Sequence, residues 1–286
     1  MEHYNKQKYK NDYCNNCGNF GHLYKNCRHP ILSYGIILYC KLEGDEDKDK
    51  KIILIERKDS ISYIEFLRGK YPSIYDIEYL KLLFSRLSKE ELNKIISYDF
   101  DKLWNDLWID TNTINHKIRK EYSKSKENFN ALKKGFDYRG TSINLEYFIK
   151  QSSPCKYIEN EWEIPKGRRK KYETNRECAI REFEEETNIT QEEYKLYNNI
   201  IPMIEEYEGI NGVRYKHVYY IGEVQKQCPL YINKNNKNQF TEIKSIGWFT
   251  KEECLQHIRD YDENKKKIIL DFFNFLDIQK NHITIK

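Results

Sequence analysis

The most informative segment of the chain reads GRRKKYETNRECAIREFEEETNI and spans residues 167–189. Thr174 and Glu177 have the spacing of a capping box, in which each side chain accepts a hydrogen bond from the backbone amide of the other residue. A helix is therefore predicted to begin near Asn175. Three apolar residues form a stripe on this helix that would pack against a sheet: Ala179, Ile180 and Phe183.

Three glutamates share one face of the predicted helix. At 100° per residue, Glu182, Glu185 and Glu186 lie within an arc of about 100°. Such crowded anions repel one another, and oriented carboxylates are the ligands that Mg²⁺ and Mn²⁺ prefer. These ions activate water and neutralise a pyrophosphate in the transition state. For an EE run taken alone, a solvated acidic face is the alternative interpretation.

A second motif lies near the N-terminus, where Cys14, Cys17, His22 and Cys27 have the spacing C-x2-C-x4-H-x4-C. Three thiolates and one imidazole form a closed tetrahedral set for structural Zn²⁺. Zinc binding of about 10 to 16 kcal/mol folds segments too short to bury a core. The spacing resembles the zinc knuckle of retroviral nucleocapsid proteins, which implies binding of single-stranded nucleic acid through Phe20. A purely stabilising or protein-binding zinc clip is the alternative.

Composition limits the class of protein. Apolar residues make up 39% and aromatic residues 14% of the chain, which favours a folded protein over a disordered one. No apolar segment is long enough for a membrane span or a secretion signal. One cysteine cluster with five scattered cysteines favours a reduced, intracellular compartment. A net charge of +4 makes no case by itself for a polyanionic partner.

The spacing of apolar residues divides the rest of the chain. Alternating β-rich runs predict strands, whereas apolar residues every three or four positions predict helices. Ser88 and Glu91 form another capping box, which predicts a helix start near Lys89. We expect a sheet-containing fold interrupted by a helical insertion. The expected elements are a hairpin at 31–42 and 51–57, helices within about 60–148, strands at 212–224 and 243–249, and a terminal helix at about 250–278.

Residues 167–189 match the Nudix box, G-x5-E-x7-R-E-U-x-E-E-x-G-U with U aliphatic or aromatic, at every fixed position but one. Asn188 stands where the box has its second glycine. Because Asn tolerates the left-handed conformation at a helix end, we expect the loop-helix-loop to persist. The resemblance implies an α+β fold, the Nudix α/β/α sandwich with a mixed sheet. It also implies hydrolysis of nucleoside diphosphates linked to another moiety, by water attack on phosphorus.

Carried over position by position, the resemblance assigns roles to the residues of the box. Glu182, Glu185 and Glu186 would bind Mg²⁺ or Mn²⁺, with Glu185 or Glu186 positioning the attacking water. Arg181 would orient them through a salt bridge with Glu173.

Residues outside the glutamate helix complete the expected site. Gly167 would open the loop with its carbonyl near the metals, and Glu242 would supply a further ligand or a general base from a later loop. Lys166 and Arg168 belong to a basic run that would attract phosphates, although charge alone does not choose between an RNA cap and an inositol polyphosphate. His217 would face either the pocket or the core.

Segments beyond the box resemble the mRNA-decapping enzymes of African swine fever virus and giant viruses, over roughly residues 32–280. The segments that carry this resemblance are the W-x-x-P-K-G entry at 162–167, YDFDKLWNDLWIDT at 98–111, CAIREFEEET at 178–187 and RYKHVYYI at 214–221. The resemblance implies release of m7GDP from capped RNA, leaving 5′-monophosphate RNA. Diphosphoinositol polyphosphates or dinucleoside polyphosphates are the alternative substrates, and an RNA-binding protein with a relict fold is the non-enzymatic alternative.

In the same group the helical insertion binds RNA. Between Thr111 and Arg139 this chain has eight basic and three acidic residues, a net charge of +5. Tyr122 and Phe129 interleave with these charges and either stack on bases or pack in the core. The residues expected to bind RNA are Lys117, Arg119, Lys120 and Lys124.

The expected organisation is a CCHC zinc knuckle at 1–30, the first Nudix strands at 31–58, a helical insertion at 59–148 and the rest of the Nudix domain at 149–286. Mg²⁺ or Mn²⁺ is expected as the catalytic cofactor and Zn²⁺ as the structural one. Capped RNA is the expected partner, with inositol pyrophosphates and a homodimer left open. The expected location is the cytoplasm, that of the host if the protein is viral, with packaging into virions left open.

Overall fold

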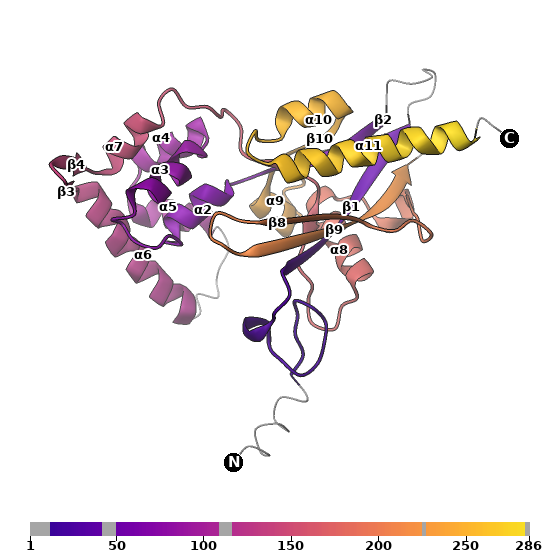
Figure 1. Ribbon diagram of the computed structural model, residues 1–286, viewed down its shortest axis with the longest axis horizontal. Coiled ribbons are helices and arrows are strands. Elements are labelled where there is room, and N and C mark those ends of the chain that lie inside the picture. Colours follow the sequence, from indigo (N-terminus) through magenta and orange to yellow (C-terminus); the bar gives the residue numbers. More distant parts are fainter. Residues whose placement is uncertain (1–11, 42–49, 109–115, 225–226, 284–286) are drawn as a thin grey trace, which may run out of the picture. The chain divides into compact units, whose positions relative to one another are not determined.

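The computed structural model describes residues 12–41, 50–108, 116–224 and 227–283 (Figure 1). Of residues 41, 116–119 and 279–283 it describes the backbone alone. The chain forms two compact units. The sheet unit consists of Met1–Glu56 with Trp162–Lys286, and the helical unit consists of Arg57–Glu161.

A mixed sheet forms the centre of the sheet unit (Figure 1). Its strands are β1 Ile31–Lys41, β2 Lys50–Arg57, β5 Trp162–Glu163, β6 Lys166–Gly167, β7 Lys195–Leu196, β8 Met203–Glu208, β9 Arg214–Val224 and β10 Ile243–Phe249. The order is β10-β2-β1-β9-β7, with β5 paired to β2, β6 to β1 and β8 to β9. Strand β1 is parallel to β9 and antiparallel to β2, so the predicted mixed sheet is confirmed.

Helices cover both faces of this sheet, because successive side chains of a strand point to opposite faces. Ile36 of β1 belongs to one core with Phe183 of the glutamate helix. Ile37 belongs to the other core with Phe272, close to the C-terminus. The predicted α/β/α sandwich is therefore confirmed. The helices of the sheet unit are α8 Asn175–Thr187, α9 Lys237–Glu242, α10 Lys251–His257 and α11 Glu263–Ile283.

The single terminal helix predicted at about 250–278 is wrong, because the structure has α10 and α11 there. Helix α10 ends before Ile258, whose backbone is extended. Asp262 then starts a second helix, since its Oδ1 accepts the backbone N–H of Lys265 at 3.2 Å in the manner of an N-cap. Both helices contribute apolar side chains to one core, so the apolar pattern does not reveal the break.

The helical unit consists mainly of helices, and the predicted helical character of this region is confirmed. The Ser88–Glu91 capping box is formed and α4 begins at Lys89, which confirms that prediction. A short hairpin lies within the region predicted to be helical, and its turn at Arg139 and Gly140 has positive φ at both residues. The elements are α2 Ile61–Leu67, α3 Ile77–Ser85, α4 Lys89–Ser97, α5 Phe100–Leu107, α6 His116–Lys134, β3 Phe136–Tyr138, β4 Thr141–Ile143 and α7 Leu145–Gln151.

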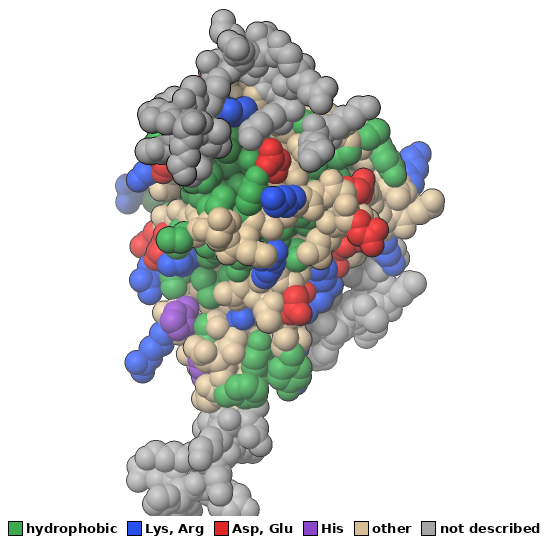
Figure 2. Space-filling model, turned by 90° about the vertical axis from the view of Figure 1, so that its right-hand side faces the viewer, with side chains coloured by type: hydrophobic (Ala, Val, Ile, Leu, Met, Phe, Trp, Pro, Cys, Tyr) green, Lys and Arg blue, Asp and Glu red, His purple; other side chains and the backbone are tan. Residues whose placement is uncertain are grey.

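Charges of both signs mix on one face of the molecule. Figure 2 shows basic and acidic side chains interspersed over the face at the right-hand side of Figure 1. None of the helices in the described part of the chain has the length and apolar character needed to cross a bilayer.

Glu91 is buried and joins the starts of two helices. Its carboxylate accepts the backbone N–H groups of Ser60 at 2.6 Å and Ser88 at 2.9 Å, together with the Ser60 hydroxyl at 2.8 Å. We expect Glu91→Ala to lower the free energy of unfolding of the helical unit by about 3 kcal/mol, because buried donors lose their acceptor. Urea unfolding followed by circular dichroism measures this. Glu90→Ala, which removes an exposed ion pair with Lys94, should cost less than about 0.5 kcal/mol, and equal losses would contradict the prediction.

Candidate functional site

Helix α8 positions the three glutamates and begins and ends where the sequence predicts. Thr174 Oγ1 accepts the backbone N–H of Glu177 at 3.2 Å, and Glu177 Oε2 accepts that of Thr174 at 2.8 Å. At the other end Asn188 is left-handed, with φ 60° and ψ 15°. Its side chain amide also bonds Asn236 and Gln239, contacts that a glycine would lack. The loop-helix-loop therefore persists with Asn in place of the box glycine.

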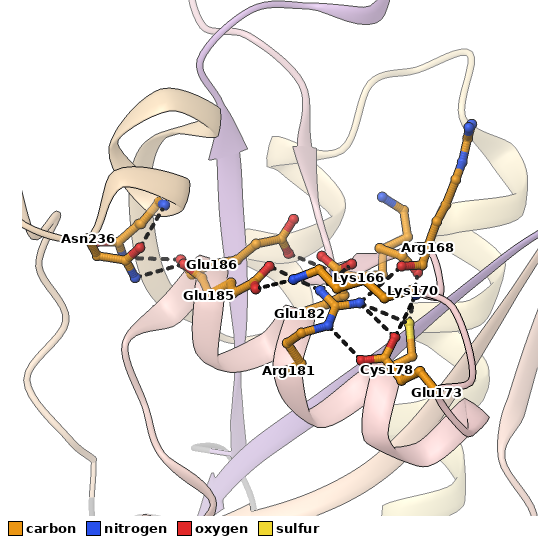
Figure 3. Close-up of polar contacts among 12 residues, drawn as sticks. Lys166, Arg168, Lys170, Glu173, Cys178, Arg181, Glu182, Glu185, Glu186 and Asn236 are labelled. Carbon is orange, nitrogen blue, oxygen red and sulfur yellow. Dashed lines mark hydrogen bonds and ion pairs between the residues drawn. The ribbon is translucent and has the colours of Figure 1, made fainter. Parts of the chain in front are cut away.

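We call the side of α8 that carries Glu182, Glu185 and Glu186 the glutamate face. Arg181 contacts several of the polar groups at this face (Figure 3). Its Nη1 lies 2.7 Å from Glu182 Oε1 and 3.0 Å from Glu185 Oε2. Its Nε contacts Glu173 Oε1 at 2.6 Å, and its Nη2 donates to the carbonyl of Arg168 at 3.0 Å. Burial opposes ionisation of Glu173, but the hydrogen bonds from Arg181 bring its pKa below the ordinary value. One guanidinium thus joins two glutamates of α8 to the loop that precedes it.

Glu186 is the most enclosed of the three carboxylates, with 7% of its surface exposed. Its Oε2 accepts the backbone N–H of Lys166 at 2.8 Å. Burial raises its pKa well above the ordinary value, and the charges of Glu163 and Glu182 add to this effect while Lys166 opposes it. A buried carboxylate with a raised pKa favours a bound cation, because the cation offsets the free energy needed to ionise the carboxylate.

Gly167 has no side chain, and the carboxylate of Glu182 occupies the space that a side chain would take. A Cβ at position 167 would lie 2.1 Å from the Glu182 carboxylate carbon, so a side chain there would displace it. Burial raises the pKa of Glu182, and its ion pair with Arg181 opposes the shift. Two carboxylates with raised pKa, adjacent on one helix, provide hard oxygen donors suited to Mg²⁺ or Mn²⁺.

The carboxylate oxygens of the three glutamates do not all lie within 4.8 Å of one another. Among the described residues, the Cys/His cluster is the only group of three or more metal-ligating side chains whose ligand atoms all lie within 4.8 Å of one another. Glu182 and Glu185 instead bond Arg181, and Glu185 Oε1 also accepts from Lys170 at 2.9 Å. The donor chemistry fits a divalent ion, and the carboxylates are held by cationic side chains.

Glu242 and the basic run lie close to this face. Glu242 ends α9 rather than lying in a loop, and its charge contributes to the raised pKa of Glu182. Arg168 is exposed, whereas the side chain of Lys166 is only 11% exposed and its Nζ contacts Glu163 Oε2 at 2.7 Å. Lys166 is therefore held by a carboxylate in the described structure, and Arg168 is open to solvent.

A group of buried charges that the sequence pattern does not indicate lies close to Lys166. Lys265 of α11 lies 4.0 Å from the same oxygen of Glu163 and 2.6 Å from Asp262 Oδ2. Nearby on the sheet, Glu205 accepts from the hydroxyl of Tyr219 at 3.0 Å and contacts His217 Nδ1 at 2.9 Å. Burial lowers the pKa of His217, and Glu205 opposes the shift. His217 is therefore a buried, partnered residue of the core, and no local sequence pattern joins it to Glu205.

The predicted RNA-binding residues of the helical unit lie on α6. Lys120 and Lys124 are exposed, and the side chains of Lys117 and Arg119 lie outside the described residues. Phe129 is 2% exposed and packs against the rings of Phe66 and Phe100, so it is a core residue. Tyr122 likewise contacts Phe100 and Trp104 and donates to Asp101. Stacking of bases on these two rings is therefore not available in this structure.

The predicted zinc ligands come together. The sulfur atoms of Cys14, Cys17 and Cys27 and a ring nitrogen of His22 lie within 4.8 Å of one another. Burial opposes ionisation of Cys27, but hydrogen bonds from Asn16 and His22 lower its pKa to about 6. Three soft sulfur donors and one imidazole in one cluster fit Zn²⁺. We call residues 12–30 the zinc module.

The module exposes apolar side chains on its surface. Phe20 is 61% exposed, and Leu23 and Tyr24 are also exposed. Lys25 and Arg28 supply exposed positive charge on the same small module. Apolar and basic side chains are thus presented together.

The chain is similar in sequence to a known domain family and to viral proteins. The NUDIX domain model matches residues 146–272. A protein of Acanthamoeba polyphaga mimivirus, provisionally named as an mRNA-decapping protein, is 30% identical over 93% of this chain and 95% of its own length. The mRNA-decapping protein g5R of African swine fever virus is 28% identical over 89% of this chain and 98% of its own length.

Among solved structures, a C. elegans Ap4A hydrolase matches 86% of this chain and 97% of its own, with a TM-score of 0.42 and 15% identity. A Nudix hydrolase from M. smegmatis, RenU, matches 86% of each chain with a TM-score of 0.37 and 10% identity. The assignment rests on the sequence relatives and the domain model. The chain belongs to the Nudix hydrolase family.

Proposed function

We propose that this Nudix pyrophosphohydrolase removes the cap from RNA, releasing m7GDP and leaving 5′-monophosphate RNA. The observation that carries the proposal is that the zinc module, with Phe20 exposed, contacts the loop before the glutamate helix, where Arg169 Nη2 donates to the carbonyl oxygen of Asn16 at 3.0 Å. An RNA-binding element beside a pyrophosphatase face suits a substrate whose phosphates are attached to RNA. The named decapping proteins that align over nearly the whole chain support this choice of substrate.

Glu182, Glu185 and Glu186 are the residues that would hold Mg²⁺ or Mn²⁺. When bound, the ion supplies charge neutralisation and lowers the pKa of water. The chain's own groups perform the positioning, because Arg181 orients Glu182 and Glu185 while the Lys166 backbone N–H orients Glu186.

The basic side chains would receive the phosphates and the RNA body. Arg168 is exposed beside the glutamate face and attracts the triphosphate of the cap. Phe20 would stack on a base, with Lys25 and Arg28 near the backbone phosphates. Lys120 and Lys124 would offer further phosphate contacts from the helical unit. Attachment of the cap to RNA held in this way raises its effective concentration at the site.

The direct test uses RNA labelled in the cap, incubated with the full chain and Mg²⁺ or Mn²⁺, with the products separated by chromatography. Labelled m7GDP is the expected product, and Glu186→Gln is the negative control. Uncapped RNA should inhibit strongly if RNA is the substrate body. Cleavage of diphosphoinositol or dinucleoside polyphosphates without cleavage of capped RNA would overturn the proposal.

We expect Phe20→Ala to raise the KM for capped RNA about tenfold, because stacking contributes about 1 to 3 kcal/mol per base. The kcat should stay within twofold, since Phe20 is 61% exposed and its ring packs on Tyr13 of the same module. A cap dinucleotide without an RNA body should be cleaved as well by the variant as by the wild type. Steady-state kinetics on both substrates measure the difference, and an equal loss on the dinucleotide would show that Phe20 does not act on the RNA body.

A further inference from the structure

The zinc module contacts the segment that connects β6 to the glutamate helix. We call Arg168–Glu173 the box loop. Arg169 Nη2 donates to the carbonyl oxygen of Asn16 at 3.0 Å, between two predicted zinc ligands, and Nη1 donates to Asn175 Oδ1 at 3.0 Å. One guanidinium therefore joins the zinc module to the first residue of α8.

Gly18 permits this close approach. A Cβ at position 18 would lie 2.3 Å from Arg169 Nη1 and 2.7 Å from its Cζ, so the guanidinium occupies the place of a side chain. The φ of Gly18 is 78°, a conformation that favours glycine. The backbone of the module is thus shaped to receive Arg169, and the contact is more specific than a surface charge near a carbonyl.

Further contacts connect the module with the rest of the sheet unit. The rings of Tyr13 and Tyr172 lie with centroids 4.9 Å apart. Asn16 Nδ2 donates to Cys27 Sγ at 3.3 Å and to the carbonyl of Pro30 at 2.8 Å, while its Oδ1 accepts the backbone N–H of Leu32 at 2.9 Å. Asn16 therefore connects a predicted zinc ligand with the start of β1 through its side chain and with Arg169 through its carbonyl.

The box loop is bound to the catalytic carboxylates on either side of Arg169. The carbonyl of Arg168 accepts from Arg181 Nη2 at 3.0 Å. Lys170 donates from its backbone to Glu173 at 2.8 Å and from Nζ to Glu185 at 2.9 Å. A loop held at Arg169 thus holds its two neighbours, which contact Arg181 and Glu185. Loss of the module contact would release the loop that orients them.

We propose that the zinc module is a clamp on the box loop, with Arg169 as the positioning residue, so that hydrolysis of the cap itself depends on a zinc-loaded module. This assigns the module a role beyond RNA capture and rests on the proposed function for its kinetic consequence. A module that only captured RNA would be dispensable for a cap dinucleotide. A clamp would be needed for both substrates.

The kinetic test compares Arg169→Ala and Arg169→Lys with the wild type on a cap dinucleotide and on capped RNA. Both variants should lose about tenfold to a hundredfold in kcat, by the same factor on both substrates, with little change in KM. A lysine keeps the charge but not the two-sided hydrogen bonding, so it should not rescue activity. Rescue by Arg169→Lys would show a phosphate-binding charge and overturn the clamp. Asn15→Ala, an exposed neighbour of Asn16, is the matched control.

A second readout needs no substrate. Hydrogen exchange of the backbone amides at 168–174 should become at least about tenfold faster in Arg169→Ala and in Cys14→Ser, and stay unchanged in Asn15→Ala. Combining Arg169→Ala with Cys14→Ser should add little, because both break the same connection. Unchanged exchange would overturn the clamp even if capped RNA is cleaved. Faster exchange in a protein that fails to cleave capped RNA would leave the clamp standing and remove the proposed substrate.

Discussion

Glu186→Gln is expected to lower kcat for capped RNA at least about a thousandfold while RNA affinity stays within twofold. Glu186 is buried, its Oε2 accepts the Lys166 backbone N–H, and a glutamine oxygen can accept the same bond. The substitution therefore removes the negative charge and proton acceptor with little change in packing. Kinetics at saturating RNA, together with an independent RNA-binding measurement, separate the two effects.

Glu184→Gln is the matched control, because Glu184 lies on the same helix and is exposed. It should retain at least about half of the wild-type kcat. Full activity in Glu186→Gln would contradict the assignment of this face as the catalytic one. A loss of RNA binding in proportion to the loss of kcat would point instead to misfolding.

The same variant gives a test that needs no substrate. The raised pKa of Glu186 means that the metal-free folded state binds its proton more tightly than the unfolded state. Its stabilising contribution is present below about pH 4.5 and is lost as the pH rises through the folded pKa. The difference in stability between Glu186→Gln and the wild type, measured without metal, should therefore grow in favour of the variant over that range. Adding Mn²⁺ should stabilise the wild type more than the variant.

Features that depend on near neighbours in the chain are the ones that sequence analysis predicts well. The capping box at Thr174 and Glu177 and the left-handed Asn188 involve residues within one turn of a helix end. The strand at Ile243–Phe249 follows from its local pattern in the same way. The Cys/His spacing predicts the assembly of the zinc ligands because three thiolates and one imidazole within a short segment form a closed tetrahedral set for one ion.

Contacts between distant segments were not predictable. Lys166 and Arg169 read as members of one basic run, yet the first is held by Glu163 and the second by the carbonyl of Asn16. The second contact joins residues 153 positions apart. A run of like charge predicts attraction for phosphates, but only the packing of the zinc module distinguishes a residue that binds a ligand from one that holds a loop.

Gly167→Ala is expected to lower kcat about a hundredfold, by displacing Glu182 from its place beside Arg181. The added Cβ would lie 2.1 Å from both the carboxylate carbon and Oε2 of Glu182, distances that require the side chain to move. Gly167 is not among the residues with positive φ, so the methyl group adds no backbone strain there. The fold should therefore persist, and the damage should fall on the glutamate face.

The Mn²⁺ concentration for half-maximal activity, measured by titration, should rise about tenfold in Gly167→Ala, because one of the three carboxylates no longer points correctly. Shortening the displaced side chain in the double variant Gly167→Ala with Glu182→Asp should lose less than the product of the two single losses, since aspartate avoids the added methyl group. A Gly167→Ala protein with unaltered kcat and Mn²⁺ requirement would mean that Glu182 can leave this position without consequence. Metal binding would then depend on Glu185 and Glu186 alone.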